Sequence, residues 1–235
     1  MDILRNLAYL TFLLPLIVFF FQPKRKKNQL SWVVFFYITY CLINEILMNL
    51  MSFYQLDEKF PNSQPAVYAL FTIFEFCFFS FYLYKLLSNK IFKKSLLFTS
   101  CFFFIIALYN FYTIISNKQE NNLIDTIPVS TSALILIIFS ILYLFEEIQS
   151  PKIGFVYENP SFWVTVGIMI YFSGTFFLFL QYSDLSISDK RNFWTINLVC
   201  VILKNFFITI SFFLEPNKKS LAFDHREKYS YTQNP

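Results

Sequence analysis

Hydrophobic residues are gathered into seven long runs, and short polar gaps separate each run from the next. Each run holds about 20 predominantly apolar residues, the length that an α-helix needs to cross the hydrocarbon core of a bilayer. A membrane β-barrel would instead show short segments of alternating polarity, which the chain lacks. The pattern therefore predicts an all-α fold, a polytopic integral membrane protein with a seven-transmembrane-helix bundle in residues 1–215. The helices are expected at residues 4–22, 31–53, 66–87, 95–115, 124–145, 161–182 and 193–214.

Basic residues are unevenly divided between the two sides of these runs. The gap after the first run, QPKRKKNQ, carries four of them, and its side has 13 Lys and Arg residues against five on the other side. Loops rich in Lys and Arg stay in the cytoplasm. We therefore expect the N-terminus outside and the C-terminus in the cytoplasm. Residues 216–235 are expected to form a short, disordered cytoplasmic tail, because they contain no apolar face long enough to fold alone.

The composition excludes several kinds of protein and of site. Charged residues make up only 14% of the 235 residues, whereas a soluble domain has about 25%. The lipid bilayer is therefore an expected partner. The net charge of +4 lies in short loops beside it, so no nucleic-acid binding is expected. The single histidine, His225, lies in the tail and the four cysteines form no CxxC pair, so we expect no metal site.

One lysine interrupts the last apolar run, FWTINLVCVILKNFFITISFF. Lys204 lies at the midpoint of the helix expected at 193–214, where a charge costs about 3 kcal/mol. It is therefore expected to face the bundle interior and to have a partner. Two acids lie at similar depth: Glu75 near the middle of the third run, and Glu45 in the second run, a few residues nearer the outer side.

Polar and small residues recur on single faces of four expected helices. Asn197 and Lys204 share a face of the seventh helix, and Gly167, Tyr171 and Gly174 follow similar spacing in the sixth. Polar faces point inward in a membrane bundle, and the two glycines are expected to be packing residues that let neighbouring helices approach closely. We expect the second, third, sixth and seventh helices to enclose a polar core that contains Glu45, Glu75, Tyr171, Asn197 and Lys204.

This polar core has two interpretations. In the first, Glu75 and Lys204 form a buried pair that only fixes helix packing. In the second, they line a ligand, ion or proton site reached from the outer face, with Glu45 at its entrance. Replacing a buried ion pair with apolar residues is often neutral or stabilising, so stability alone is a weak reason to retain one.

Two adjacent acids, Glu146 and Glu147, stand at the cytoplasmic end of the fifth expected helix, where the helix dipole disfavours negative charge. One interpretation is that they are solvated or paired with loop lysines. The other is that they present a docking surface to a cytoplasmic partner.

Three stretches, FEFCFFSFYLYKLL, NPSFWVTVGIMIYFSGTFFLF and FWTINLVCVILKNFF, resemble small seven-helix inner-membrane proteins of bacteria, which are similar to the sensor modules that accompany histidine kinases. The resemblance covers the third, sixth and seventh helices. It implies a multi-pass protein of the cell (inner) membrane with a role in extracytoplasmic sensing. No kinase or output domain follows Pro216, so a signal is expected to pass to a separate cytoplasmic signalling protein.

A second resemblance is topological, to the retinal-binding rhodopsins. It rests on seven helices, an outside N-terminus, a mid-membrane lysine in the seventh helix and an acid in the third, and it implies a retinal Schiff base on Lys204 with Glu75 as counter-ion. The chain departs from the rhodopsin pattern: the third helix has no Arg near an Asp-Trp pair, the seventh has no Asp upstream of Lys204, and the sixth lacks the Trp-Pro pattern. We therefore expect neither retinal nor another cofactor.

Three functional classes fit these features. A sensor or receptor-like module, the favoured class, fits the odd number of helices, the short loops and the lack of soluble domains. A small-solute or proton-coupled transporter fits the deep ionisable residues, although no internal repeat is visible. An intramembrane enzyme acting on lipid would use Glu75 or Glu45 as a general base, but it lacks clustered His and Asp residues, so enzymatic activity is the less favoured expectation.

Overall fold

Seven α-helices, one in each expected span, make up most of the structure, a computed structural model that describes residues 2–22, 29–56, 60, 62–116, 126–149, 155–182 and 185–214. These residues contain no strand, and a single turn of 3-10 helix precedes the sixth long helix. The expected tail, 216–235, lies outside the described residues. The elements are α1 (Asp2–Phe21), α2 (Gln29–Phe53), α4 (Ser63–Leu86), α5 (Lys90–Ile115), α6 (Thr126–Gln149), η2 (Val156–Glu158), α7 (Pro160–Gln181) and α8 (Ile187–Phe213).

Three helix ends lie well outside the expected boundaries, because polar residues extend these helices beyond their apolar runs. α5 begins at Lys90 instead of residue 95, after Asn89, whose side chain accepts a backbone hydrogen bond of 2.8 Å. α8 begins at Ile187 instead of residue 193, where Ser186 is the N-cap. α6 continues to Gln149, four residues beyond 145. An apolar run marks the part of a helix that suits lipid, whereas an N-cap marks where the helix begins.

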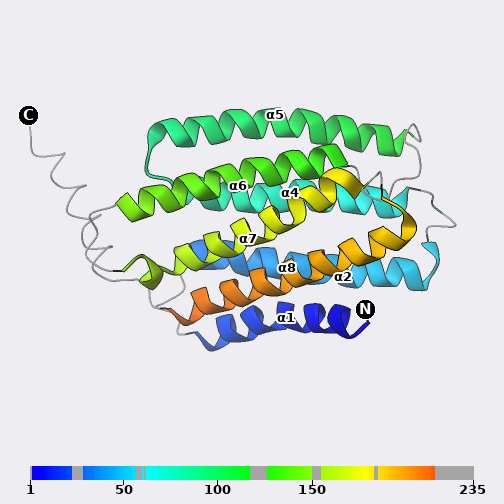
Figure 1. The fold of residues 1–235 in the computed structure, drawn as a ribbon, viewed down its shortest axis with the longest axis horizontal. Coiled ribbons are helices and arrows are strands. Elements are labelled where there is room, and N and C mark those ends of the chain that lie inside the picture. Colours follow the sequence, from blue (N-terminus) through cyan, green and yellow to red (C-terminus); the bar gives the residue numbers. More distant parts are fainter. Residues whose placement is uncertain are drawn as a thin grey trace, which may run out of the picture.

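The helices lie side by side, and each packs against the next along the chain (Figure 1). α8 returns to pack against α1, and α4 also contacts α6. Since seven spans follow one another in alternating directions, α1 begins at one end of the bundle and α8 ends at the other (Figure 1). The inward faces of α2, α4, α7 and α8 supply the side chains at the centre of the bundle, described below.

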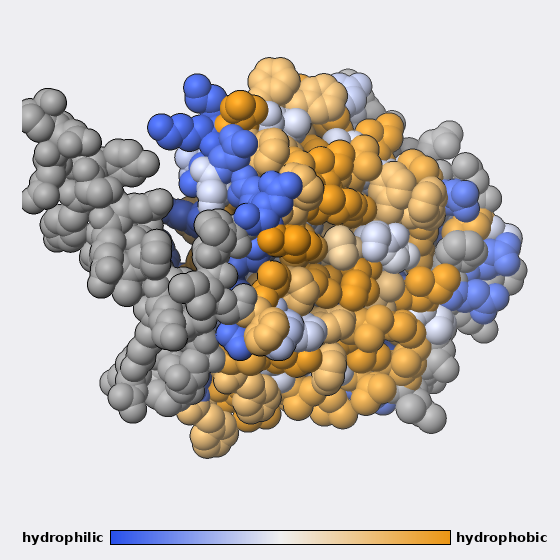
Figure 2. Space-filling view, turned by 60° about the vertical axis from the view of Figure 1, so that its left-hand side comes forward, coloured by the Kyte–Doolittle hydropathy of each residue, from blue (hydrophilic) through white to orange (hydrophobic). Residues whose placement is uncertain are grey.

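The outer surface of the bundle is strongly apolar. Figure 2 shows a broad hydrophobic band across the middle of one face, with hydrophilic residues gathered at its two ends. All seven helices expose large apolar side chains, for example Phe20, Phe98 and Phe177. A soluble protein would rarely expose contiguous apolar patches of this extent.

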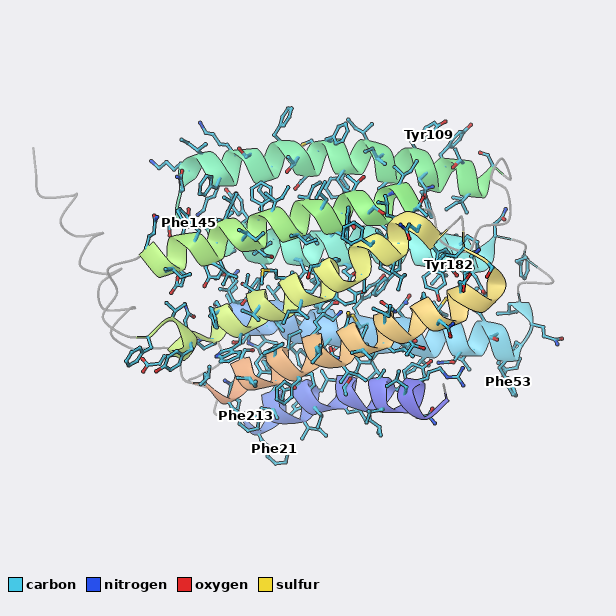
Figure 3. All side chains as sticks on the ribbon, viewed as in Figure 1. Phe21, Phe53, Tyr109, Phe145, Tyr182 and Phe213 are labelled. Carbon is cyan, nitrogen blue, oxygen red and sulfur yellow. The ribbon has the colours of Figure 1, made fainter. Side chains whose placement is uncertain are left out.

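The length and polarity of the helices agree with this surface. Each of the seven is long and apolar enough to cross a membrane. Aromatic side chains lie near both ends of the bundle, as in the interfacial belts of membrane proteins. The seven candidate membrane spans therefore indicate a multi-pass membrane protein. In Figure 3, Phe21, Phe145 and Phe213 lie toward one end, and Phe53, Tyr109 and Tyr182 toward the other.

Candidate functional site

Lys204 lies at the centre of the bundle, and its side chain is only 2% exposed. It projects from the inward face of α8. Its Nζ donates a short hydrogen bond to the hydroxyl of Tyr37 in α2. A lysine enclosed so fully in a membrane bundle needs compensation by hydrogen bonds and opposite charge.

Glu75, in α4, supplies the opposite charge. Its Oε1 lies 3.7 Å from the Lys204 Nζ, within ion-pair distance, and its side chain is also buried. The Tyr37 hydroxyl donates a hydrogen bond of 2.7 Å to the same oxygen. Tyr37 therefore joins the two charged groups, because its hydroxyl oxygen accepts a hydrogen bond from the ammonium and its O–H donates one to the carboxylate.

Two tyrosine rings complete the surroundings of the ammonium. The Lys204 Nζ lies 3.9 Å from the ring centroid of Tyr171, in α7, and 5.0 Å from that of Tyr37. The negative face of an aromatic ring attracts a cation, and this attraction is stronger where water is excluded. Lys204 thus meets a carboxylate, a hydroxyl and two ring faces. We call Tyr37, Glu75, Tyr171 and Lys204 the core cluster.

The core cluster takes one side chain from each of α2, α4, α7 and α8. These are the four helices that the sequence predicts to enclose a polar core. The charged atoms have left water, which costs several kcal/mol per ion, and their mutual attraction offsets this only with good geometry and further hydrogen bonds. The position of each helix therefore affects the energy of the other three through the cluster.

The glycines of α7 allow α8 to approach. A Cβ on Gly167 would lie 3.2 Å from the backbone oxygen of Lys204, and a Cβ on Gly174 would lie 2.5 Å from the Sγ of Cys200. Both positions face α8, where larger side chains would push the two helices apart. The close approach of α7 brings Tyr171 over the Lys204 ammonium.

Glu45, the expected entrance group, lies outside the core cluster. It is two turns beyond Tyr37 along α2, toward the Phe53 end of the bundle, and it is half-buried. The Tyr9 hydroxyl, from α1, lies within hydrogen-bonding reach of its carboxylate, and Lys204 lies within electrostatic range. Among the described residues, no basic side chain lies within ion-pair distance of Glu45.

Two further residues surround Glu45. The Asn49 Nδ2 donates to the Tyr9 hydroxyl at 3.4 Å and to the Glu45 backbone oxygen at 2.8 Å. Tyr68, in α4, lies within electrostatic range of both Glu45 and Tyr9. We call Tyr9, Glu45, Asn49 and Tyr68 the outer cluster.

Asn197, the remaining expected site residue, is buried in α8 two turns from Lys204. Its Oδ1 accepts no hydrogen bond from the described part of the chain. Among the described residues, this oxygen has no hydrogen bond to the core cluster. Its place in the predicted site remains a prediction.

Sequence reasoning missed Tyr37 and the pair Asn205 and Thr11. Tyr37 lies eight residues before Glu45, so the two residues share a face of the second helix, and this spacing is the signal that could have found Tyr37. The Asn205 Nδ2 donates to the Thr11 Oγ1 at 3.0 Å and ties α8 to α1. The sequence feature that could have indicated Asn205 is its position directly after Lys204, as a second polar residue within the apolar run.

Glu146 and Glu147, at the end of α6, bind the starts of neighbouring helices. The two carboxylate oxygens of Glu146 accept from the backbone nitrogens of Ser88 and Asn89, at 2.7 and 2.9 Å, just before α5 begins. Glu147 accepts from Asn159, the N-cap residue of α7, at 2.9 Å. The N-terminus of a helix favours negative charge, so these contacts compensate for the unfavourable dipole of α6.

The donor groups of the site favour no metal: in the described segments, no three or more His, Cys, Asp or Glu side chains stand together. The core cluster instead provides a fixed ion pair joined by a tyrosine hydroxyl. Comparison with protein-family models, curated proteins and solved structures finds no match to the chain.

Proposed function

We propose that the chain is a sensor or receptor-like membrane module in which the core cluster couples the positions of four helices. The proposal includes a bacterial inner-membrane location, an outside N-terminus, a cytoplasmic C-terminus and a separate cytoplasmic signalling protein as partner. No cofactor is part of it. The observation that carries it is the path from Lys204 through Tyr37 to Glu75, which joins α8, α2 and α4 and lies against Tyr171 of α7.

A buried ion pair suits a switch better than a scaffold. Apolar residues of similar size commonly stabilise a fold as well or better, so an ion pair is a weak device for stability alone. An ion pair does respond to protonation and to ligand binding, which leave apolar contacts largely unchanged. A proton or ligand that changes one charge alters every contact of the cluster. A ligand that binds one of two arrangements of similar energy more tightly than the other shifts the population toward it.

The cytoplasmic end of the bundle offers a route for the change. α4 ends beside Ser88 and Asn89, and Glu146 holds these residues to the end of α6. A displacement of α4 at the core cluster would therefore reach the end of α6 through backbone hydrogen bonds. Helix shifts of about 1–2 Å are typical of such transitions.

The test measures helix positions with the core cluster intact and altered. Spin labels are placed on α4 and α8 at the exposed positions Lys85 and Phe213, in a chain without its native cysteines, reconstituted in nanodiscs. We expect Glu75→Gln to shift the distance between these labels by about 2 Å or more, because it removes the carboxylate charge beside Lys204. A second pair on α5 and α6, at Ile91 and Ile148, should keep its distance. Identical Lys85–Phe213 distances in both proteins would contradict the proposal.

A proton-coupled transporter is the second candidate, favoured by three ionisable groups deep in the bundle, Glu45, Glu75 and Lys204. It predicts proton movement into proteoliposomes under an imposed membrane potential. Glu75→Gln should abolish that movement. A flux that persists unchanged in this variant would remove the candidate.

A further inference from the structure

We infer that the outer cluster binds a protonated amine that enters from the Phe53 end of the bundle. This inference rests on the proposed function, because it names the class of ligand that a receptor built on the core cluster would receive.

Within the described part of the chain, Glu45 has no charged partner of its own, unlike Glu75. Among the described residues, the acidic and basic side chains in the middle of the bundle are Glu45, Glu75 and Lys204. Glu75 and Lys204 pair with each other at 3.7 Å. Glu45 is left without an ion-pair partner among the described residues. An ionised carboxylate in this setting is stabilised when a cation joins it, so Glu45 offers a place for one positive charge.

The groups around Glu45 are of the same kinds as those around Lys204. The core cluster holds the Lys204 ammonium with one carboxylate and two tyrosines. The outer cluster offers a similar set, one carboxylate with Tyr9 and Tyr68. The core cluster shows how a carboxylate and tyrosines hold an ammonium, and the outer cluster brings the same kinds of group together from α1, α2 and α4, with Glu45 two turns from Tyr37 along α2.

The outer cluster suits an ammonium group better than a metal ion. A metal ion prefers several carboxylate or carbonyl oxygens, or His and Cys ligands, and the outer cluster has a single carboxylate with phenol rings. Ring faces and one carboxylate suit an ammonium group, which gains both an ion pair and cation–π contacts. Asn49 lies at the exposed side of the cluster and holds the Tyr9 hydroxyl, which fixes the position of that phenol.

The outer cluster is more exposed than the core cluster. Glu45 is half-buried, whereas Glu75 and Lys204 are buried. An amine at Glu45 would lie within electrostatic range of Lys204, since Glu45 itself does. Its positive charge would weaken the attraction of Lys204 to that side of the bundle. Binding at the outer cluster would in this way alter the core cluster without direct contact.

The experiment titrates n-butylammonium chloride against the full chain in nanodiscs of neutral lipid, with sodium chloride and sodium butyrate at equal ionic strength as references. The thermal unfolding midpoint reports binding, because a ligand that binds only the folded state raises it. We expect the amine to raise the unfolding midpoint in a saturable way, and the two sodium salts to leave it unchanged. Glu45→Gln should weaken the apparent affinity about tenfold or more, since a charged hydrogen-bonded partner is lost. Glu158→Gln, at the opposite end of the bundle, makes the same change of charge and should bind as wild type.

A second pair of variants tests the ring and serves if Glu45→Gln fails to fold. Tyr68→Phe keeps the ring and should retain binding, whereas Tyr68→Leu should weaken it about fivefold. No rise in the midpoint, or equal affinity in Glu45→Gln and wild type, would overturn the inference; so would equal binding by the two Tyr68 variants. Amine binding that leaves the Lys85–Phe213 distance unchanged would support the amine site and contradict the sensor. A distance shift in Glu75→Gln without amine binding would do the reverse.

Discussion

At the scale of single residues, the Tyr37 hydroxyl is the group that joins the two charges of the core cluster. Tyr37→Phe removes a buried acceptor from Lys204 and a buried donor to Glu75 while keeping the ring. We expect a loss of about 1–3 kcal/mol in the free energy of unfolding, because hydrogen bonds to charged groups are the stronger ones. Unfolding in mild detergent measures it. Tyr40→Phe is the matched control. Tyr40 lies on the same helix and its ring packs against Phe71, a contact that the phenylalanine keeps, so the free energy of unfolding should fall only slightly. Equal losses in the two variants would contradict the expectation.

The ion pair itself is tested by a double-mutant cycle of Lys204→Met and Glu75→Gln. Each single change leaves one buried group without its opposite charge and should cost about 3 kcal/mol. The double variant should lose clearly less than the sum, because it leaves no unpaired charge. Thermal unfolding of the four proteins in the same detergent provides the comparison. Additive losses would mean that the 3.7 Å contact carries no coupling energy.

The sequence pointed to Glu75 and Lys204 for a physical reason: charges within apolar runs are rare and costly, so two at matching depth stand out. Tyr37 did not stand out, because it is one of 15 tyrosines and its polar atom is only a hydroxyl. Which tyrosine reaches the ion pair depends on the rotation of α2 against α4 and α8. A single sequence does not contain that rotation.

At the scale of helices, the contact between α7 and α8 depends on small residues. In Gly174→Ala, the new Cβ would lie 2.5 Å from the Cys200 Sγ. We expect a loss of about 1–2 kcal/mol, as for other overpacked sites. Cys200→Ala should restore most of it, because the Cys200 Cβ is 3.9 Å away. Unfolding of both single variants and the double variant tests this. Ser173→Ala, at an exposed position of α7, should be nearly neutral; failure of Cys200→Ala to rescue would contradict the packing explanation.

The acids of α6 give a second prediction at this scale. Glu146→Gln keeps the size of the side chain but removes the charge that two backbone nitrogens share before α5. We expect faster hydrogen exchange at the Ser88 and Asn89 amides, because a charged acceptor at a helix N-terminus is stronger than a neutral one. Glu158→Gln should leave both amides unchanged. Unaltered exchange in Glu146→Gln would show that these hydrogen bonds do not depend on the charge.

The number of helices could be predicted from the sequence, whereas several of their ends could not. Apolar length is a direct consequence of bilayer thickness, so each span was found. The start of α8 depends instead on Ser186 and the polar turn after it, which an apolar run does not include. Likewise, the sequence predicts that Glu146 and Glu147 are either solvated or paired with loop lysines, or that they bind a cytoplasmic partner. The partners that they have in the structure are the start of α5 and the N-cap of α7. These partners depend on how the helices pack, which the order of residues along the chain does not give.

At the scale of the whole molecule, the distribution of Lys and Arg over the loops predicts the orientation of the chain in the membrane. The side with 13 Lys and Arg residues is expected in the cytoplasm and the side with five outside. Ser88, between α4 and α5, lies on the first side, and Ser116, after α5, lies on the second. These two serines flank a single helix, so one of them must face each side of the membrane if α5 crosses it.

Single cysteines at these positions test the orientation in a chain whose four native cysteines have been replaced by alanine. A membrane-impermeant maleimide added to intact cells should label Ser116→Cys and leave Ser88→Cys unlabelled, because the reagent reaches only the outer side. After permeabilisation, both should be labelled, which controls for the reactivity of each position. Labelling of Ser88→Cys alone in intact cells would reverse the orientation and place the outer cluster toward the cytoplasm. The amine of the outer cluster would then be a cytoplasmic ligand, and the signalling partner would have to bind the opposite end.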